Sequence, residues 1–398
     1  MHYFRLLGLR GSIGSGGNRS ILAPSLSFFS LGQRVTAPVL LAGVTVLGAL
    51  SGCTGSQTPN ASSNNAPNTT VNSSSQAASI NVVATTSVLC DLTQRIARSA
   101  DKPTVKLNCL VKAGQDPHTY QPNPADRRAI EDADLIFYGG YGMEPNIVRL
   151  ITAAPNAITK VAVHELAVPK PLQGGHHHGD EHDHGGESDQ HSDQPEKKAK
   201  ETPAGTVEHS EAEEADPHVW HNAQNGIQMV KVIETALTKA DPSNAALYTK
   251  NAQTILDRLT KVDGWIKASI ATIPANARKL ITTHDALGYY AAAYGIPVQG
   301  ALQGLSTDEQ PTPTQVKTLV DTVKAAQVPT IFAEKTVNPA LIQTVAREAG
   351  VKVADRELFA DGLGEAGSGA ETYEDMLITN TKTIVTGLGG KITDLQAP

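Results

Sequence analysis

Two short turns of identical sequence each present a histidine in a position that suits a ligand-binding role. Residues 116–118 read Asp-Pro-His inside the loop Gly114–Pro122, where glycine and proline break regular structure. The same tripeptide returns at residues 216–218, so His218 repeats the setting of His118. A single histidine in a loop is most often a solvated surface residue. Two identical rigid turns are hard to ascribe to packing, so both imidazoles are candidate metal ligands.

Two further donor residues, His284 and Asp361, follow predicted strands in the second half of the chain. Open α/β sheets bind ligands at the carboxyl ends of their strands. If two lobes face each other across a cleft, these residues converge with His118 and His218, two from each lobe. Three neutral imidazoles and a carboxylate suit a divalent transition metal, and a near-tetrahedral cage favours Zn²⁺. Taken singly, His284 also fits a structural histidine and Asp361 a turn-forming aspartate.

The elements that must position these side chains alternate between strands and helices. In the first half, strands are predicted at Asn81–Thr85, Lys106–Val111, Asp134–Tyr138 and Ile158–Val163, and helices at 87–100 (with Ser87 as a candidate cap), 123–133 and 144–154. In the second half, strands are predicted at Lys279–Thr283, Pro297–Leu302, Thr330–Ala333 and Lys352–Ala354, and helices at 286–294, 313–327, 338–349 and 373–388. Such alternation predicts parallel sheets covered on both faces.

A long amphipathic helix separates the two alternating halves. Apolar residues at helical spacing run from Asn244 to Ile273, after a shorter helix at 222–239. We therefore expect an α/β protein with two Rossmann-like lobes, parallel sheets, one long connecting helix and a metal site in the cleft between the lobes. The expected boundaries are 80–242 for the N-terminal lobe, 243–274 for the linking helix and 275–395 for the C-terminal lobe.

The N-terminus has the composition of an export signal. Residues 1–52 contain arginines and no acidic residue, and Val35–Leu50 is a mostly apolar run before Ser-Gly-Cys53. This ending resembles a bacterial lipobox, in which the cysteine is lipidated after cleavage. A transmembrane helix is the alternative, although the run is short and interrupted by glycine for a bilayer about 30 Å thick. Residues 53–79 are uncharged and rich in serine and asparagine, which predicts a flexible tether. We therefore expect an extracytoplasmic, periplasmic domain, lipid-anchored to a bacterial membrane through Cys53.

An acidic, histidine-rich insert interrupts the first lobe. Residues 174–215 combine glycines and acidic residues with His176, His177, His178, His182, His184 and His191, followed by His209. This composition cannot form an apolar core, so we interpret the segment as a disordered loop that collects metal ions weakly. A solvated insert without a role is the alternative. The chain carries a net charge of −7 and no basic cluster that suggests nucleic acid as a partner.

Two cysteines, Cys90 and Cys109, follow the lipobox cysteine. Export into an oxidising compartment favours a disulfide between them. Two free, buried thiols are the alternative.

Four motifs carry a resemblance to a known family. They are Gly114–Pro122, Asp216–Trp220, Thr282–Tyr290 and Leu358–Gly364. In this order they resemble the zinc/manganese-binding periplasmic (solute-binding) receptors of ABC importers, the ZnuA/TroA-like family, over about residues 80–390. The resemblance implies two α/β lobes joined by one long helix, with the metal between them. It also places His118, His218, His284 and Asp361 on the ligand positions of the family.

The resemblance also bears on the choice of metal. Family members that resemble manganese receptors usually carry glutamate where this chain has His284, and members with histidine there more often handle zinc. The acidic, histidine-rich insert also resembles zinc receptors. We therefore expect Zn²⁺ as the cargo, with Mn²⁺ as the alternative. The expected partner is an ABC permease in the plasma membrane, and the receptor itself is expected to be a monomer.

Several residues near these motifs leave alternatives open. His221 stands where the family usually has an apolar residue, so it is either an additional or competing ligand or a surface histidine. Glu309 and Glu334 match polar family positions near the cleft, where they either support the ligands or lie on the surface. His164 is interpreted as structural or exposed.

Three classes of function fit such a metal site. A transport receptor needs one tight, closed site, and the chain has no Gly-x4-Gly-Lys-Ser/Thr pattern that would make it the ATPase. A zinc hydrolase keeps an open coordination position beside a general base, and no His-Glu-x-x-His pattern appears. A metal store or adhesin at the cell surface would need many weak sites. We therefore expect a receptor and not an enzyme.

Overall fold

The computed structural model describes residues 79–100, 103–174 and 214–395. The expected export signal, Cys53 and most of the tether lie outside these residues. So do the expected weak ligands of the insert, His176, His177, His178, His182, His184 and His191, together with His209. Among the described residues, no helix combines the length and the apolar character needed to span a membrane.

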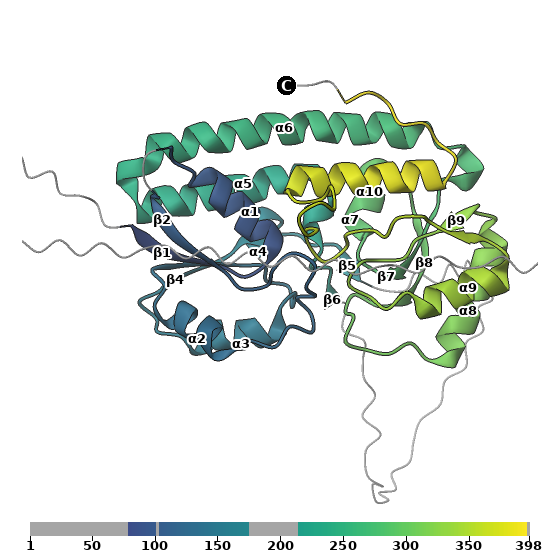
Figure 1. Ribbon diagram of the computed structural model, residues 1–398, viewed down its shortest axis with the longest axis horizontal. Helices are drawn as coiled ribbons and strands as arrows, with labels where there is room; N and C mark the ends of the chain where they lie inside the picture. Colours follow the sequence, from purple (N-terminus) through teal and green to yellow (C-terminus); the bar gives the residue numbers. More distant parts are fainter. Residues whose placement is uncertain (1–78, 101–102, 175–213, 396–398) are drawn as a thin grey trace, which may run out of the picture. The chain divides into compact units, whose positions relative to one another are not determined.

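The first lobe is built on a parallel four-stranded sheet (Figure 1). Its strands are β1 (Ile80–Ala84), β2 (Val105–Cys109), β3 (Leu135–Tyr138) and β4 (Thr159–Ala162), in the order β2-β1-β3-β4. The expectation of a parallel sheet is confirmed, and each strand begins and ends within two residues of its predicted bounds.

Helices cover both faces of this sheet. They are α1 (Ser87–Ile96), α2 (Pro124–Glu131), α3 (Pro145–Ala153) and a short α4 (Val163–Ala167), which the sequence did not predict. Successive residues of β1 point to opposite faces. Val82 therefore lies in the larger core with α1, and Val83 lies in a separate smaller core with α2 and α3. Figure 1 shows α1 on one side of the sheet and α2 and α3 on the other.

The cap of helix α1 differs from the prediction. The side chain of Thr86, rather than that of Ser87, accepts a hydrogen bond from the N–H of Leu89, at 3.3 Å. The hydroxyl of Ser87 instead accepts from the N–H of Leu363 in the second lobe, at 2.9 Å. The assignment of Ser87 as the cap was wrong, because its hydroxyl is used between the lobes.

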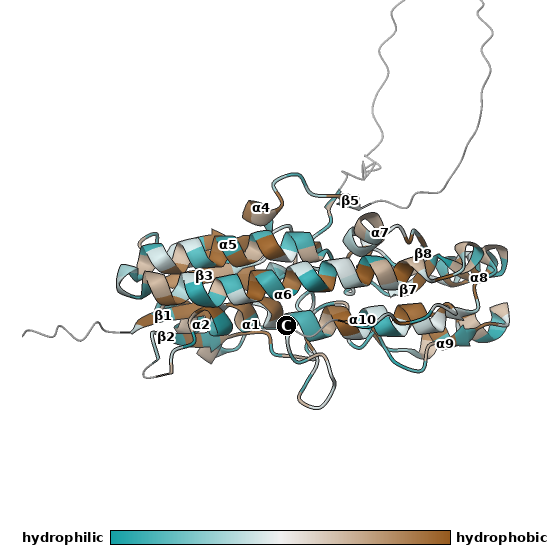
Figure 2. Cartoon of the chain, turned by 90° about the horizontal axis from the view of Figure 1, so that it is seen from above, coloured by the Kyte–Doolittle hydropathy of each residue, from teal (hydrophilic) through white to brown (hydrophobic). Residues whose placement is uncertain are grey.

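The long helix α6 (Ala245–Ala271) runs along both lobes (Figures 1 and 2). It packs against α1 and α5 (Ala223–Ala240) of the first lobe and against α10 (Tyr373–Gly387) of the second. Its buried residues recur at helical spacing, among them Tyr248, Ile255, Leu259, Val262, Ile266 and Ile270. One long helix thus connects the lobes, as expected. The described residues fall into one compact unit, so the domain boundaries along the chain stay predictions.

The second lobe repeats the alternation with shorter strands. Strand β7 (Leu280–His284) pairs in parallel with β8 (Val298–Gln303), and β9 (Thr330–Ile331) pairs in parallel with β10 (Lys352–Val353). A 2.9 Å hydrogen bond from Phe332 N–H to the carbonyl of Ile281 places the end of β9 beside β7. β9 is shorter than predicted because Ala333 and Glu334 pair with Leu358 instead of extending the pairing with β10. The remaining helices are α7 (Gly288–Tyr294), α8 (Pro313–Ala326) and α9 (Ala340–Ala349).

Short segments complete the connection between the lobes. The antiparallel pair β5 (Gln173–Gly174) and β6 (Glu214–Ala215) joins the two ends of the insert. Three short 3-10 helices follow, η1 (Val219–His221), η2 (Pro242–Asn244) and η3 (Ala275–Ala277). The turn that carries His218 therefore stands between the base of the insert and η1.

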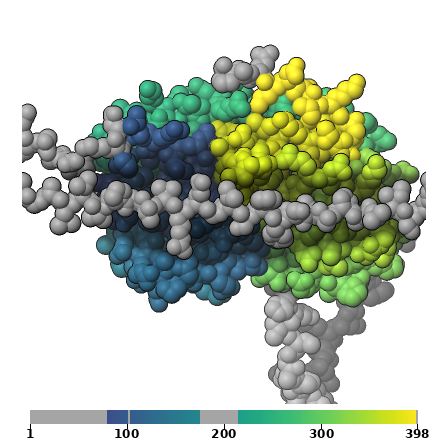
Figure 3. Space-filling view, in the orientation of Figure 1, coloured from purple at the N-terminus to yellow at the C-terminus, as the bar shows by residue number. Residues whose placement is uncertain are grey.

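Helices of the two lobes also meet through a partly buried ion pair. Arg95 of α1 contacts both carboxylate oxygens of Glu374 in α10, and Asp91 accepts the N–H of Tyr373 at 3.0 Å. Figure 3 shows the blue surface of the first lobe in contact with the yellow surface of the C-terminal segment on this face. The lobes are thus joined by side chains as well as by α6.

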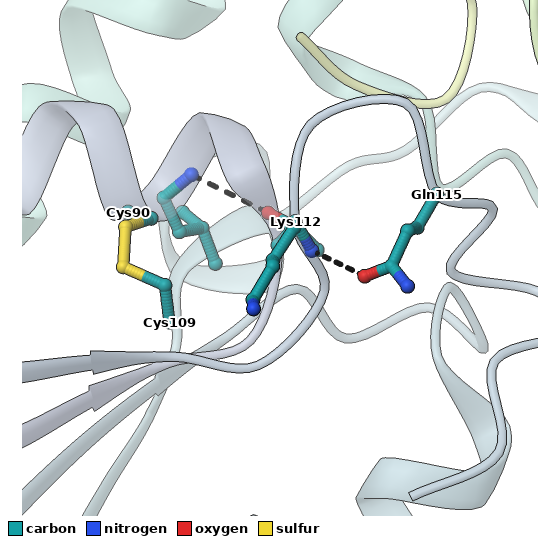
Figure 4. Close-up of a disulfide and its surroundings, with 6 residues drawn as sticks. Cys90, Cys109, Lys112 and Gln115 are labelled. Atoms are coloured by element: carbon teal, nitrogen blue, oxygen red, sulfur yellow. Dashed lines mark hydrogen bonds between the residues drawn. A yellow bond between two sulfur atoms is a disulfide. The ribbon is translucent and has the colours of Figure 1, made fainter. Parts of the chain in front are cut away.

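A disulfide joins α1 to the end of β2 (Figure 4). Cys90 and Cys109 are bonded, with their Cα atoms 5.7 Å apart, so the structure differs from the alternative of two free thiols. Just beyond β2, the N–H of Lys112 donates to the side-chain carbonyl of Gln115 at 2.9 Å. This turn begins the loop that carries His118.

Candidate metal site

Four donor atoms from the two lobes meet in the interior. They are Nε2 of His118, His218 and His284 and Oδ1 of Asp361. Ligand atoms of these four residues lie within 4.8 Å of one another. Nε2 of His118 is 3.2 Å from Nε2 of His218, and Oδ1 of Asp361 is 3.4, 3.6 and 3.1 Å from the three imidazoles in chain order. The structure therefore brings together the four candidate ligands.

The two Asp-Pro-His turns share one construction. In each, the N–H of the histidine donates to Oδ1 of the aspartate two residues earlier, His118 to Asp116 and His218 to Asp216, both at 2.9 Å. Such aspartate turns fix the backbone locally. His284 is the last residue of β7, so a strand end positions the third imidazole.

All four side chains are buried, and none of the residues is more than 5 % exposed. Nε2 of His284 and Oδ1 of Asp361 have no hydrogen-bond partner among the described residues. A buried polar atom left unpaired costs roughly 1–3 kcal/mol. The arrangement therefore favours a cation that both atoms can contact. Imidazole nitrogens and carboxylate oxygens are donors that hold Zn²⁺ in four-coordinate sites.

Buried carboxylates hold the outer nitrogens of two of the imidazoles. Nδ1 of His218 lies 2.9 Å from Oδ1 of Asp216, and Nδ1 of His284 is hydrogen-bonded to Glu334. An ionised carboxylate only accepts hydrogen bonds, so Nδ1 carries the proton in both rings. Each Nε2 then presents its lone pair to the cluster, as a metal ligand must.

Two further contacts complete the support. The hydroxyl of Thr336 donates to Oδ2 of Asp361, which leaves Oδ1 facing the imidazoles. Glu334 also accepts the backbone N–H of His284 at 3.1 Å. Glu334 is fully buried, so the alternative of a surface carboxylate is wrong for this residue, whereas Glu309 is exposed.

Charges inside the cluster stabilise one another. Burial alone would raise the pKa of Asp361, but the charge of the adjacent His284 and the closeness of the His118 and His218 imidazoles hold this pKa well below its usual range. Burial alone would lower the pKa of His284, yet Asp361 and Glu334 raise it well above its ordinary value. The pKa of His218 is also raised against the effect of burial, by Asp216 and Asp361. Protons and a metal cation therefore compete for the same nitrogens.

His221 lies outside the group of four donors. Its Nε2 is 2.8 Å from the carbonyl oxygen of Ala360, and the residue is 1 % exposed. A carbonyl oxygen only accepts, so Nε2 carries the proton. Burial, together with the charge of His218, lowers the pKa of His221 to about 4, and the ring is neutral at pH 7. His221 is therefore neither a member of the ligand cluster nor a surface histidine, but a buried hydrogen-bond donor.

His164 is a structural histidine of the first lobe. It is fully buried, and its ring centroid lies 5.3 Å from that of Trp220. Burial, and then the charge of His218, lower the pKa of His164 to about 3. The alternative of an exposed His164 is wrong.

Some supporting residues were not predicted from the sequence. Asp216 was recognised only as part of a turn, although an aspartate two residues before a histidine can reach both its N–H and its Nδ1. No sequence pattern near Thr336 predicts its role, because it meets Asp361 only through the packing of the second lobe.

The fold and the site define a class of protein, the two-lobed receptors that enclose a metal ion. A family model described as "Zinc-uptake complex component A periplasmic" matches residues 82–387. The manganese-binding lipoprotein MntA of Halalkalibacterium halodurans is 31% identical over 309 residues, covering 78% of this chain and 88% of that protein. The manganese ABC transporter substrate-binding lipoprotein PsaA of Streptococcus mitis is 31% identical over 315 residues, covering 78% and 89%. The solved structure of the periplasmic zinc-binding protein TroA from Treponema pallidum is similar, with a TM-score of 0.64, 27% identity and coverage of 78% and 99%.

The chain belongs to this periplasmic zinc-uptake component family, the ZnuA/TroA-like solute-binding receptors of ABC importers. It is an extracytoplasmic metal-binding receptor and not an enzyme. Receptors of this kind work with a permease in the membrane. The family and the fold class expected from the sequence are confirmed.

Proposed function

We propose that this receptor captures Zn²⁺ at His118, His218, His284 and Asp361 and delivers it to an ABC permease in the plasma membrane. The observation that carries the proposal is the donor set, three imidazole Nε2 atoms and one carboxylate oxygen in one buried cluster. Nitrogen-rich, four-donor cages are typical of zinc.

The spacing of the donors supports a tetrahedral ion. Donor atoms about 2.0–2.1 Å from Zn²⁺ in a regular tetrahedron lie about 3.3 Å from one another. Four of the pairs in this cluster are separated by 3.1 to 3.6 Å. These four separations already suit a tetrahedral zinc site, and all ligand atoms of the cluster lie within 4.8 Å of one another.

A manganese receptor is the second candidate. It is favoured by the two relatives above, which are named for manganese. Manganese prefers oxygen donors and more of them. This cluster offers one carboxylate against three imidazoles, and the structurally similar TroA is described as zinc-binding. Donor chemistry is therefore our ground for preferring zinc.

The proposal extends to segments outside the described residues. We propose that Cys53 is lipidated and that residues 53–79 tether the receptor to the membrane, in line with the lipoprotein names of the relatives. The histidines of the insert, residues 174–215, bind zinc weakly and raise its local supply. The receptor acts as a monomer and takes no nucleic acid as a partner.

Competition between zinc and manganese for the metal-free mature protein, at fixed pH, tests the proposal. One tight zinc site per chain is expected. Its affinity should fall at least about 100-fold in His118→Ala and in Asp361→Ala, a larger loss than removal of an outer support causes. A tight site that prefers manganese would overturn the choice of metal. Unchanged affinity in both variants would overturn the ligand set.

A further inference from the structure

We propose that His221 is a positioning residue that sets how long the metal stays bound, by tying the backbone beside Asp361 to the first lobe. The inference rests on the proposed ligand set, because His221 acts only through Asp361. It concerns the release of the metal rather than its identity.

One hydrogen bond joins the surroundings of two ligands from opposite lobes. Helix η1 begins directly after His218 and ends at His221. The Nε2–H of His221 donates to the carbonyl of Ala360, the residue immediately before Asp361, at 2.8 Å. The short helix that follows one ligand therefore holds the backbone that leads into another.

The bond lies where water cannot readily replace it. His221 and Ala360 are each 1 % exposed. When the lobes begin to separate at this point, the carbonyl loses its donor before the gap admits a water molecule, and a buried unpaired carbonyl is unfavourable. The bond thus resists movement of Asp361 away from His218, a movement that would take the carboxylate out of the cluster.

Residues of different lobes set the orientation of the Asp361 carboxylate and its distance from the imidazoles of His118 and His218. Thr336 belongs to the same lobe as Asp361, and its hydroxyl turns the carboxylate so that Oδ1 faces the imidazoles. That contact cannot set how far the carboxylate lies from His118 and His218. His221 contributes to this distance from one side of Asp361, because it reaches across from the first lobe to Ala360, while Ser87 of the same lobe holds Leu363 on the other side.

The structure also contains a matched control. The hydroxyl of Tyr373 donates to the carbonyl of Trp220 at 2.5 Å, so it too joins η1 to the second lobe. This bond is buried as well, but it does not end beside a ligand of the second lobe. Removing it weakens the contact between η1 and the lobe without freeing Asp361.

The test compares zinc release from the full mature protein and its variants. Zinc-loaded protein is mixed with an excess of a fluorescent chelator in a stopped-flow instrument. His221→Leu should release zinc about tenfold faster, which corresponds to about 1.4 kcal/mol. His221→Gln should remain within about threefold of the wild type, because its amide N–H can donate at a similar reach. Tyr373→Phe should remain within about twofold. His221→Met serves as the apolar variant if His221→Leu does not fold.

The visible spectrum of bound Co²⁺ is a second measurement, and a general loss of protein stability does not change it. The visible absorption of bound Co²⁺ depends on the geometry of its ligands, so the spectrum should change in His221→Leu and stay close to the wild type in Tyr373→Phe and His221→Gln. Three outcomes would overturn the proposal. Zinc release could be equally faster in His221→Leu and Tyr373→Phe, or the release rate could be unchanged in His221→Leu. The third outcome is a release rate in His221→Gln as high as that in His221→Leu.

The variant Asp361→Ala distinguishes a failure of the proposed ligand set from a failure of the inference about His221. If it retains tight zinc binding, the ligand set fails and the inference fails with it. If it loses zinc while His221→Leu releases zinc at the wild-type rate, the ligand set stands and only the inference about His221 fails.

Discussion

Glu334 and His284 form a hydrogen bond inside the protein, and both residues have no exposed surface. One carboxylate oxygen of Glu334 bonds to Nδ1 of the imidazole, and the other accepts the backbone N–H of the same histidine at 3.1 Å. A single glutamate therefore fixes the ring, the tautomer and the backbone of a ligand. Such supports also raise the basicity of the ligating nitrogen.

The first prediction follows from this pair. Glu334→Gln keeps the size of the side chain but removes the negative charge that supports the imidazole. Zinc affinity should fall by about 10- to 100-fold, measured by competition with a chelator of known affinity. The exposed Glu309→Gln is the matched control and should leave the affinity unchanged. A similar loss in both variants, or in neither, would contradict this role of Glu334.

A second prediction concerns the choice of metal at His284. Replacing this histidine by glutamate leaves two imidazoles and two carboxylates, a harder and more anionic donor set. The ratio of zinc to manganese affinity should fall by at least about tenfold, or about 1.4 kcal/mol. Raw affinity can still favour zinc, because zinc stands above manganese in the usual divalent series. Competition between the two metals at fixed pH gives the ratio, and an unchanged ratio would show that His284 does not set it.

A third prediction concerns acid stability and rests on His164. Its pKa is lowered to about 3 in the folded protein, against about 6.5 in an unfolded chain. The unfolded state therefore takes up a proton that the folded state does not, as the pH falls from about 6.5 towards 3. The stability contributed by neutral His164 is complete above this range and is lost as the pH falls through it, at up to about 1.4 kcal/mol per pH unit.

His164→Leu removes this dependence. Between pH 7 and pH 5, the free energy of unfolding of the wild type should fall relative to the variant by about 2 kcal/mol. Urea unfolding of the metal-free proteins at the two pH values measures the change. A difference between wild type and variant that does not vary with pH would rule out His164 as the titrating group.

The fourth prediction concerns the disulfide between Cys90 and Cys109. The two cysteines are 19 residues apart, and closing a loop of this length in the unfolded chain is worth about 3 kcal/mol in the chain-entropy model. The double variant Cys90→Ser/Cys109→Ser should lose about that much stability in urea unfolding. Dithiothreitol should destabilise the wild type and leave the double variant unaffected. Equal sensitivity of both proteins to the reductant would mean that the bond is not formed in solution.

A fifth prediction concerns the insert. Deleting residues 175–213 and joining Gly174 to Glu214 through Asn-Gly keeps the β5–β6 pair, which a two-residue hairpin turn can close. The tight zinc site should keep its affinity, and the total zinc bound at high concentration should fall. Isothermal titration measures both quantities. Loss of the tight site in this variant would show that the insert supplies ligands to it.

Much of the fold was predictable because it depends on local pattern. The β-rich run at Asn81–Thr85 and the long apolar spacing from Asn244 to Ile273 reappear as β1 and α6 with bounds shifted by two residues or fewer. Three of the donor side chains could be proposed from local pattern, because His118 and His218 lie in identical turns and His284 ends β7, whereas Asp361 lies eight residues beyond the end of β10. Their support could not be predicted in the same way. His221 meets Ala360 across 139 residues, and Glu334 meets His284 across 50, so tertiary packing alone decides these pairs.

The pairing of β5 with β6 affects how a receptor of this kind can evolve. Gly174 pairs with Glu214, and the pairing continues with a 2.8 Å hydrogen bond from the N–H of Asp216 to the carbonyl of Leu172. Asp216 holds the imidazole of His218, so along the chain this hydrogen bond lies between the base of the insert and the candidate ligand His218. Closing a chain segment costs only about 0.6 kcal/mol more for each doubling of its length. Descendants of this sequence can therefore gain, lose or exchange histidines in the insert while inheriting the buried coordination geometry intact.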